Sequence, residues 1–227
     1  MARQLTFDLP VRQALGREDF FVSPANAAAV ATLEDWRAWP ARKMLLTGPE
    51  GAGKTHLAHV WAALAGARIV AARELAGAEI PALATGPVAV EDADALAGDA
   101  AAEASLFHLH NLTLAEGQSL LLTASAPASR WGLSLPDLQS RMQGTATAAL
   151  QPPDDTLLAA VLVKLFSDRQ LGVEPKVIDW LTRHMDRSFA AARGLVDALD
   201  AAALAERRAI TQRFAASVLD KLGPDTA

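Results

Sequence analysis

Short apolar runs alternate with longer amphipathic segments between residues 43 and 150. The apolar runs have the length of strands, and the segments between them repeat apolar residues at helical spacing. Strands that alternate with helices favour a parallel sheet with helices on both faces. We therefore expect an α/β domain with a five-stranded parallel sheet. Its strands are expected at residues 44–47, 67–71, 87–92, 119–125 and 145–150.

The pattern changes after Gln151, where Pro152 and Pro153 break the chain and every later periodic segment is helical. A helix capped by Asp155 or Thr156 is expected to reach about residue 171. The others are expected at about 175–184, after the N-cap Ser188, and over 212–222 after Thr211. Roughly seventy residues are few for a free-standing core, so we interpret this segment as a lid packed on the first domain.

These two patterns divide the chain into three parts. Residues 1–18 are expected to be a peptide and linker, 19–152 the α/β core, and 153–227 the helical lid. Before the first strand we expect a helix from Ala27 to about Trp39. Ser23 is its expected N-cap, and Pro24 would occupy its first position.

The composition limits the class of protein. Of the 227 residues 51% are hydrophobic, which is ample for a buried core. No apolar run approaches the roughly 18–20 residues that span a membrane, and no long apolar segment follows the N-terminus as in a signal peptide. The lack of cysteine excludes disulfides and zinc–thiolate sites. We expect a cytoplasmic protein without membrane partners, and the net charge of −5 argues against a protein that mainly grips nucleic acid.

Residues 48–55 have the phosphate-loop form G-x-x-x-x-G-K-[ST], between an expected strand and an expected helix. A chance glycine turn is the alternative. The glycines let backbone N–H groups turn toward an anion, and the helix N-terminus adds partial positive charge. Lys54 can reach the β- and γ-phosphates, and the Thr55 hydroxyl can hold Mg²⁺. We expect ADP or ATP with Mg²⁺ at a site formed by Gly48, Pro49, Gly51, Ala52, Gly53, Lys54, Thr55 and His56.

A second part of this site is expected where the strand at 87–92 ends. Glu91 and Asp92 stand at its carboxyl end, which lies beside the loop in a parallel sheet. Together with Thr55 they are the expected metal ligands, and Asp92 would also orient the attacking water. Two solvated acids that merely follow a strand are the alternative.

The sequence allows two interpretations of Thr123 and two of Val22. Thr123 is either a sensor of the γ-phosphate or a residue that caps its strand. Val22, beside Phe20 and Phe21, either lines an adenine pocket or packs in the core. His108 and His110 stand near no Cys and in no H-E-x-x-H pattern, so we interpret both as ordinary helix residues and not as metal ligands.

An α/β phosphate-loop domain followed by a helical lid resembles the AAA+ ATPases over nearly the whole chain. Residues 48–57 resemble the GxxGxGKTHL segment of the DnaA/Hda clade, including its trailing His-Leu. Glu91 and Asp92 occupy the place of the family's Asp-Asp or Asp-Asn pair, from which Glu91 departs by one methylene. Residues 151–154 resemble the hinge into the lid.

The same resemblance assigns roles to two arginines. Residues 138–142 resemble the L-x-S-R-[FL] element, which implies that Arg141 is an arginine finger acting in trans. Residues 192–195 resemble the sensor-2 segment, which implies that Arg193 reaches the phosphates from the lid. Without the resemblance, a surface salt bridge would explain Arg141, and helix capping or lid packing would explain Arg193.

The N-terminal peptide at residues 4–9 resembles the QLxLxL peptide with which Hda proteins bind the sliding clamp of DNA polymerase III. Asp8 departs from that pattern, and a peptide tucked onto its own domain is the alternative. The expected clamp-binding residues are Gln4, Leu5, Phe7 and Leu9. DnaA itself continues beyond the lid into a DNA-binding domain, whereas this sequence stops at residue 227.

The resemblance implies a negative regulator of chromosomal replication initiation, with DnaA and the clamp as partners and DNA reached through the clamp. Arg141 would promote hydrolysis of the ATP bound by DnaA, while this chain's own ATPase would be weak or absent. It would act at the replisome and could self-associate through Arg141 and the phosphate-loop side of a neighbour. A helicase loader that engages single-stranded DNA, and a scaffold that promotes no hydrolysis, are the alternatives.

Overall fold

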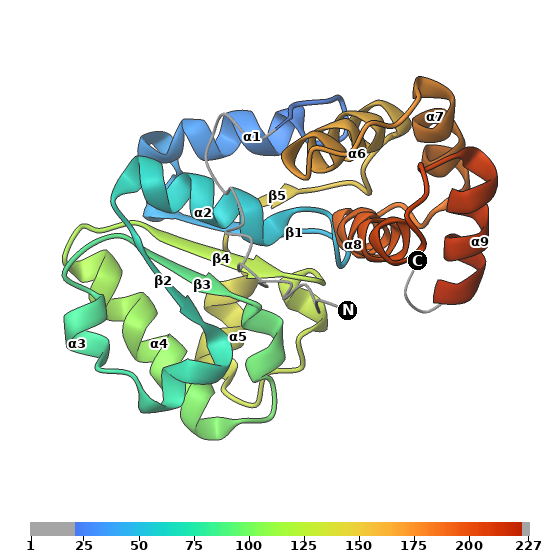
Figure 1. Ribbon diagram of the computed structural model, residues 1–227. Helices are drawn as coiled ribbons and strands as arrows, with labels where there is room; N and C mark the ends of the chain where they lie inside the picture. Colours follow the sequence, from blue (N-terminus) through green and yellow to red (C-terminus); the bar gives the residue numbers. More distant parts are fainter. Residues whose placement is uncertain (1–20, 224–227) are drawn as a thin grey trace.

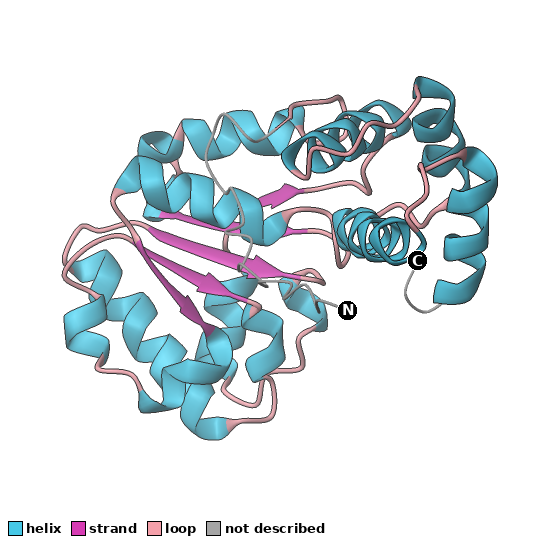
Figure 2. Ribbon diagram, in the orientation of Figure 1, coloured by secondary structure: helices cyan, strands magenta, loops and turns pink. Residues whose placement is uncertain are grey.

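The computed structural model describes residues 21–223, which form an α/β core joined to a helical lid (Figure 1). The carboxyl ends of the strands point toward the lid (Figure 2). Within residues 21–223, no helix combines the length and apolar character needed to cross a membrane.

The core contains the expected five-stranded sheet, in the order β2-β3-β4-β1-β5. Every neighbouring pair is parallel, which confirms the prediction. Its central strand β4 is buried along its whole length, as is its neighbour β1. The strands are β1 (Lys43–Thr47), β2 (Arg68–Ala71), β3 (Val88–Glu91), β4 (Leu120–Ala124) and β5 (Thr147–Ala149).

Helices cover both faces of this sheet (Figure 1). On one face lie α1 (Ala27–Glu34) and α2 (Lys54–Ala65), and on the other lie α3 (Ile80–Leu83), α4 (Ala100–Ala115) and α5 (Pro136–Gln143). Successive residues of a strand point to opposite faces, so β4 serves two cores: Leu121 packs with Trp61, whereas Leu122 packs with Leu106. Short 3-10 helices join these elements at Trp36–Ala38, Pro40–Arg42, Ala72–Gly77, Ala93–Leu96 and Ala128–Arg130.

The predicted helix at residues 27–39 begins at Ala27 as expected, but its predicted N-cap and its predicted end are wrong. Its N-cap is Asn26, because Ser23 instead closes a turn in which its carbonyl accepts from the Asn26 and Ala27 amides. The α-helix ends at Glu34, and a 3-10 turn follows. Trp39 then leaves the helical path: its indole donates to the Thr32 carbonyl at 2.7 Å and its ring stacks on another tryptophan in the core.

The lid contains α6 (Asp155–Asp168), α7 (Pro175–His184), α8 (Phe189–Glu206) and α9 (Gln212–Leu222), and it has a buried cluster of its own. Ser188 and Thr211 cap α8 and α9 as predicted. The expected cap of α6 is wrong, because the Asp154 carboxylate accepts from the Leu157 amide. The helix ends at Asp168, short of the expected residue 171, and Gln170 just beyond it adopts a left-handed backbone with φ of 58°.

The hinge into the lid is tied back to the beginning of the described chain. The amide of Gln151 donates at 3.3 Å to the carbonyl of Ala25, the residue before the N-cap of α1. The hinge therefore contacts the segment that enters the core as well as β5, from which it emerges.

Candidate phosphate-binding site

The loop at residues 48–53 is held between the end of β1 and the start of α2. The Gly48 amide donates to the Ala124 carbonyl at the end of β4. Gly51 and Gly53 have φ of 72° and 94°, a left-handed conformation that other residues adopt only with strain. Gly53 is the N-cap of α2, so the unpaired N–H groups of that helix face the loop.

The loop contacts the lid directly. The Phe189 amide, at the first position of α8, donates to the Gly51 carbonyl at 2.9 Å. A Cβ atom on Gly51 would lie 2.4 Å from the Cβ of Ser188, and one on Gly53 would lie 2.9 Å from the Phe189 ring. The two glycines are therefore required by the packing of α8 as well as by their backbone conformation.

A pocket of about 530 Å³ lies between the loop, the strand ends and α8, within the usual size of small-molecule sites. It draws residues from the core and from the lid, including three acidic and two cationic side chains. Its lining residues are Glu50, Gly51, Gly53, Lys54, Thr55, His56, Asp92, Asp94, Ala95, Ser125, Ala190 and Arg193.

Lys54 is the buried cation of the loop. Its ammonium donates to the carbonyls of Gly48 and Pro49 at 2.9 and 3.0 Å, and only 8% of the residue is exposed. Gly48 and Pro49, both predicted site residues, thus hold the lysine through their carbonyls. Ala52, also predicted, is buried against the core. The lysine side chain is therefore fixed within the curve of the loop, beside the helix N-terminus.

Glu91 is half-buried beside Thr55. Burial raises the pKa of its carboxyl, an effect strengthened by Asp92 and opposed by the nearby His59 and by a hydrogen bond with the Thr55 side chain. Its Oε1 atom is buried and finds no hydrogen-bond partner among the described residues.

These residues fit a divalent cation. An unpartnered carboxylate oxygen beside a threonine hydroxyl, with Asp92 on the pocket wall, supplies the oxygen ligands that Mg²⁺ takes. Across residues 21–223, His, Asp and Glu side chains do not gather into a cage of three or more. Mg²⁺ in phosphate-loop proteins needs no such cage, because phosphate and water oxygens complete its shell.

Asp92 adopts a left-handed backbone with φ of 54°, which is uncommon for a residue with a side chain and clusters at functional sites. Its amide donates to the Thr123 hydroxyl at 3.0 Å. Thr123 is 1% exposed and is absent from the lining of the pocket, so its observed contact joins the ends of β3 and β4. A sensor role for Thr123 stays a prediction.

Asp94 and Ser125 also line the pocket, although neither was predicted as a site residue. The Ser125 amide donates to the Asp94 carboxylate at 2.8 Å, which joins the residues after β3 to those after β4. Each follows a selected residue by two positions, and polar residues just beyond a strand end were the available signal. Val22, in contrast, is 49% exposed and lies outside the lining of the pocket.

The structure brings Arg193 to the phosphate loop from the lid. Arg193 and Ala190, one helical turn apart on α8, both line the pocket. The Arg193 Nε atom donates to the Phe189 carbonyl at 3.4 Å, a bond within its own helix. The guanidinium is therefore at the pocket without an acidic partner among the ion pairs of residues 21–223.

Arg141 is exposed on α5 and does not line this pocket. Its guanidinium lies over the Phe107 ring, 5.3 Å from the centroid. Its carbonyl accepts from Lys43, the first residue of β1, whereas the phosphate loop follows the last residue of that strand. Arg141 is thus attached at the far end of β1 from the pocket, and the ion pairs of residues 21–223 do not include it. The predicted clamp peptide at residues 4–9 lies outside the described residues.

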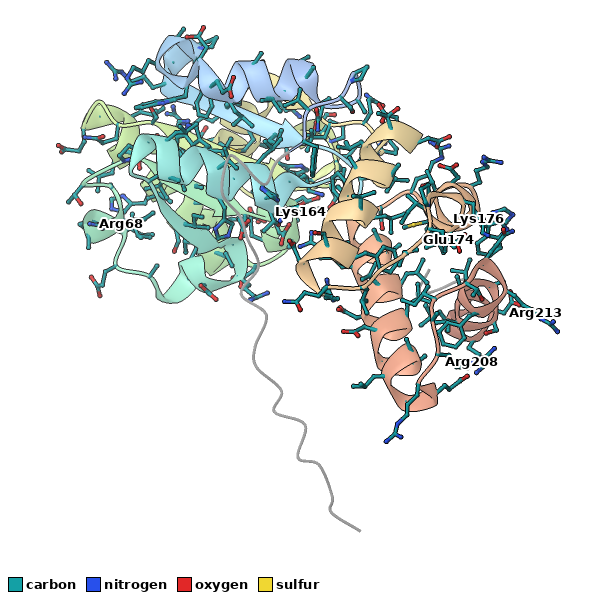
Figure 3. All side chains as sticks on the ribbon, turned by 45° about the horizontal axis from the view of Figure 1, so that its top comes forward. Arg68, Lys164, Glu174, Lys176, Arg208 and Arg213 are labelled. Carbon is teal, nitrogen blue, oxygen red and sulfur yellow. The ribbon has the colours of Figure 1, made fainter. Side chains whose placement is uncertain are left out.

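The outer surface of the lid mixes charges of both signs. Figure 3 shows Arg208 and Arg213 pointing away from the core. Arg208 pairs with Glu206 at 3.1 Å, and Lys176 pairs with Glu174 at 2.5 Å. These two pairs place a carboxylate beside each of two basic side chains of the lid.

The parallel sheet, the phosphate loop and the appended lid together form a fold of the AAA+ type. Residues 155–219 match the family described as "Hda, lid domain". The fold is similar to the crystal structure of domain III of the replication initiation protein DnaA from Thermotoga maritima, with a TM-score of 0.77 and 18% identity over 94% of this chain and 98% of that one. The lid thus matches an Hda-family domain, and the core and lid together have the fold of DnaA domain III.

Other solved structures have the same fold. AMPPCP-bound DnaA from Aquifex aeolicus gives a TM-score of 0.66 at 20% identity, over 81% of this chain and 64% of that one. The AAA domain of FIGL-1 in complex with ADP gives 0.66 at 14% identity, over 89% and 81%. At these identities the likeness concerns the fold alone.

Proposed function

We propose that this protein is a negative regulator of replication initiation that promotes hydrolysis of the ATP bound by DnaA. One observation carries the proposal: a lid that matches the Hda family completes a phosphate-loop pocket with its own Arg193. The lid is thus joined to the loop at the place where a nucleotide would be recognised.

The pocket would hold ADP or ATP. Backbone N–H groups of the loop and the N-terminus of α2 would bind the phosphates, with Lys54 and Arg193 as the cations. Thr55, Glu91 and Asp92 would hold Mg²⁺, which, when bound, neutralises charge on the β- and γ-phosphates. The support is the buried, unpartnered oxygen of Glu91 beside Thr55, and the DnaA structure from Aquifex aeolicus carries the ATP analogue AMPPCP.

Intrinsic hydrolysis would be weak. The Glu91 carboxylate holds the Thr55 side chain in a hydrogen bond that a cation must replace. Asp92 would have to orient the attacking water from a left-handed backbone fixed by Thr123. The nucleotide would then serve mainly to set the angle between core and lid, because Arg193 and the Phe189 amide both meet the loop.

Arg141 would act on a neighbouring molecule. It is exposed, it is remote from the pocket of its own chain, and the ion pairs of the described residues leave it unoccupied. An arginine finger supplied in trans stabilises the charge that develops in phosphoryl transfer and raises the rate by roughly 10³–10⁵. Presented to ATP on DnaA, Arg141 would convert the initiator to its ADP form.

Recruitment would depend on Gln4, Leu5, Phe7 and Leu9. An apolar peptide of this kind would bind the polymerase III sliding clamp, and the clamp would bring the protein to DNA without a DNA-binding surface of its own. The protein would therefore act in the cytoplasm at the replisome. The mixed charges on the outer face of the lid support an indirect association with DNA.

The test follows ATP prebound to DnaA, in the presence of clamp loaded on DNA. The wild-type protein is expected to speed conversion to ADP, and Gln4→Ala and Arg141→Ala are each expected to abolish that effect. A wild-type protein that leaves the conversion rate unchanged refutes the proposal. Retained activity of Arg141→Ala supports the scaffold alternative, and tight, salt-dependent binding of single-stranded DNA supports the helicase-loader alternative.

A further inference from the structure

A buried ammonium lies beneath the helix that carries Arg141. Lys43, the first residue of β1, is 8% exposed. Its Nζ atom donates to the Arg141 carbonyl at 3.0 Å and lies 3.1 Å from His110 Nε2. Three elements meet at this atom: β1 provides the lysine, α4 the histidine, and the last turn of α5 the carbonyl.

His110 is arranged to accept from the lysine. It is 2% exposed, and burial, followed by the charges of Lys43 and Arg141, lowers its pKa to about 4 against an opposing bond to Asn111. The ring is therefore neutral near pH 7. With the proton on Nδ1, which lies 3.2 Å from the Asn111 side-chain oxygen, Nε2 is left as an acceptor. The lysine thus has two oriented acceptors.

This lysine is not explained by stability alone. Burial, and then the like charge of Arg141, lower the pKa of Lys43, so the folded protein disfavours its charged form. Buried charges can often be replaced by apolar residues of similar volume without loss of stability. What the ammonium provides, and an apolar side chain would not, is a donor to the carbonyl of Arg141, at a helix end whose carbonyls lack partners within the helix.

We propose that Lys43, oriented by His110, is a positioning residue for Arg141. The lysine fixes the main chain at Arg141 from below, so that the guanidinium leaves α5 in one direction, over the Phe107 ring. The Thr145 hydroxyl donates to the same carbonyl at 2.8 Å, so the lysine provides one of two bonds at this point. The inference rests on the proposed role of Arg141 as a trans-acting finger.

The kinetic test uses the full chain in the assay of DnaA-bound ATP, with the maximal rate and the half-saturating concentration measured separately. Lys43→Met keeps the apolar stem and removes the ammonium. We expect its maximal rate to fall about ten- to a hundredfold, since small misplacements of a catalytic group have effects of this order, while half-saturation changes less than about twofold. Thr113→Val is the matched control, because this hydroxyl is buried in the same helix α4 and has no hydrogen-bond partner among the described residues; we expect its rate to equal that of the wild type.

A pair of substitutions at His110 separates positioning from packing. His110→Gln retains an oxygen that can accept from the ammonium, whereas His110→Leu does not. We expect the glutamine variant to keep more of the maximal rate than the leucine variant. Equal rates for the two variants contradict a role for the hydrogen bond.

Hydrogen exchange provides a readout that does not depend on activity. The amides of Gly144 and Thr145 donate to carbonyls in the last turn of α5, and Lys43→Met is expected to speed their exchange at least tenfold relative to Thr113→Val. If Lys43→Met leaves the exchange of these amides unchanged, the positioning role is overturned. It is also overturned if Lys43→Met keeps the wild-type maximal rate of hydrolysis while Arg141→Ala loses it. Either result leaves the proposed function standing. If Arg141→Ala itself keeps the full rate, the proposed function fails and this inference fails with it.

Discussion

The contact between Gly51 and Ser188 can be tested by a double-mutant cycle. An alanine at Gly51 would have to adopt φ of 72° and place its Cβ 2.4 Å from the Cβ of Ser188. The left-handed conformation costs roughly 1–2 kcal/mol for a residue with a side chain. The steric overlap adds to this, because Cβ atoms essentially never approach within 3.0 Å and the start of α8 must therefore move.

Ser188→Gly removes the clashing atom at little cost. Glycine replaces serine at an N-cap with a loss of only a few tenths of a kcal/mol. The nearest remaining atom, the Cα of residue 188, would lie 3.4 Å from the new Cβ, which is ordinary contact. We therefore expect Gly51→Ala to destabilise the protein less in the Ser188→Gly background, with a coupling free energy of about 1–2 kcal/mol.

The assay is urea unfolding of the wild type, the two single variants and the double variant. Gly66→Ala controls for backbone strain, because Gly66 has a similar φ of 67° but a Cβ there would meet no atom within 4 Å. It should be destabilised by the left-handed conformation alone and show no coupling to Ser188→Gly. A cycle that is additive to within about 0.5 kcal/mol would refute the direct contact between lid and loop.

Three further predictions concern single residues. Arg193→Ala should weaken ADP binding about tenfold or more, since a charge-assisted hydrogen bond contributes roughly 1.5–3 kcal/mol; calorimetric titration measures this, and an unchanged affinity would contradict a phosphate contact. Glu103 is 1% exposed and accepts from the Gly98, Ser134 and Leu135 amides, bonds that outweigh burial and lower its pKa. The stabilisation by the Glu103 carboxylate is therefore present at neutral pH and is lost as pH falls through the lowered pKa. Glu103→Gln should lower the free energy of unfolding at pH 7 by about 2 kcal/mol and make that free energy depend less on pH in the acid range. The pKa of His110 falls to about 4 on folding, so between pH 6.5 and 4 the unfolded chain binds a proton that the folded chain does not. The free energy of unfolding should therefore drop by ~2 kcal/mol from pH 7 to pH 5. Urea unfolding of His110→Gln should show a smaller drop, and a drop equal to that of the wild type would refute the burial argument.

The regular elements were predictable because local sequence determines them. The strands follow from short apolar runs, and two lid helices follow from the side-chain caps Ser188 and Thr211, which satisfy amides only three residues away. The helix at 27–39 was extended too far because its apolar spacing continues to Trp39. The sequence pattern did not reveal that Trp39 stacks on Trp61 from a different part of the chain.

Most of the predicted site comes from one continuous segment, to which the end of a strand added Asp92 and the family resemblance added Arg193. The loop motif led to Lys54, Thr55 and the other residues of a continuous stretch. Asp94, Ser125 and Ala190 come from three separate segments that meet at the pocket only in the folded chain. Lys43 was missed for the same reason: its partners lie 67 and 98 residues away, a distance over which no periodicity carries information.

The bond between Gln151 and Ala25 has a mechanical consequence. It joins the segment that enters the core to the hinge that leads into the lid, although 126 positions of sequence separate the two residues. A force applied to the chain just before α1 would therefore be shared by the core and the hinge.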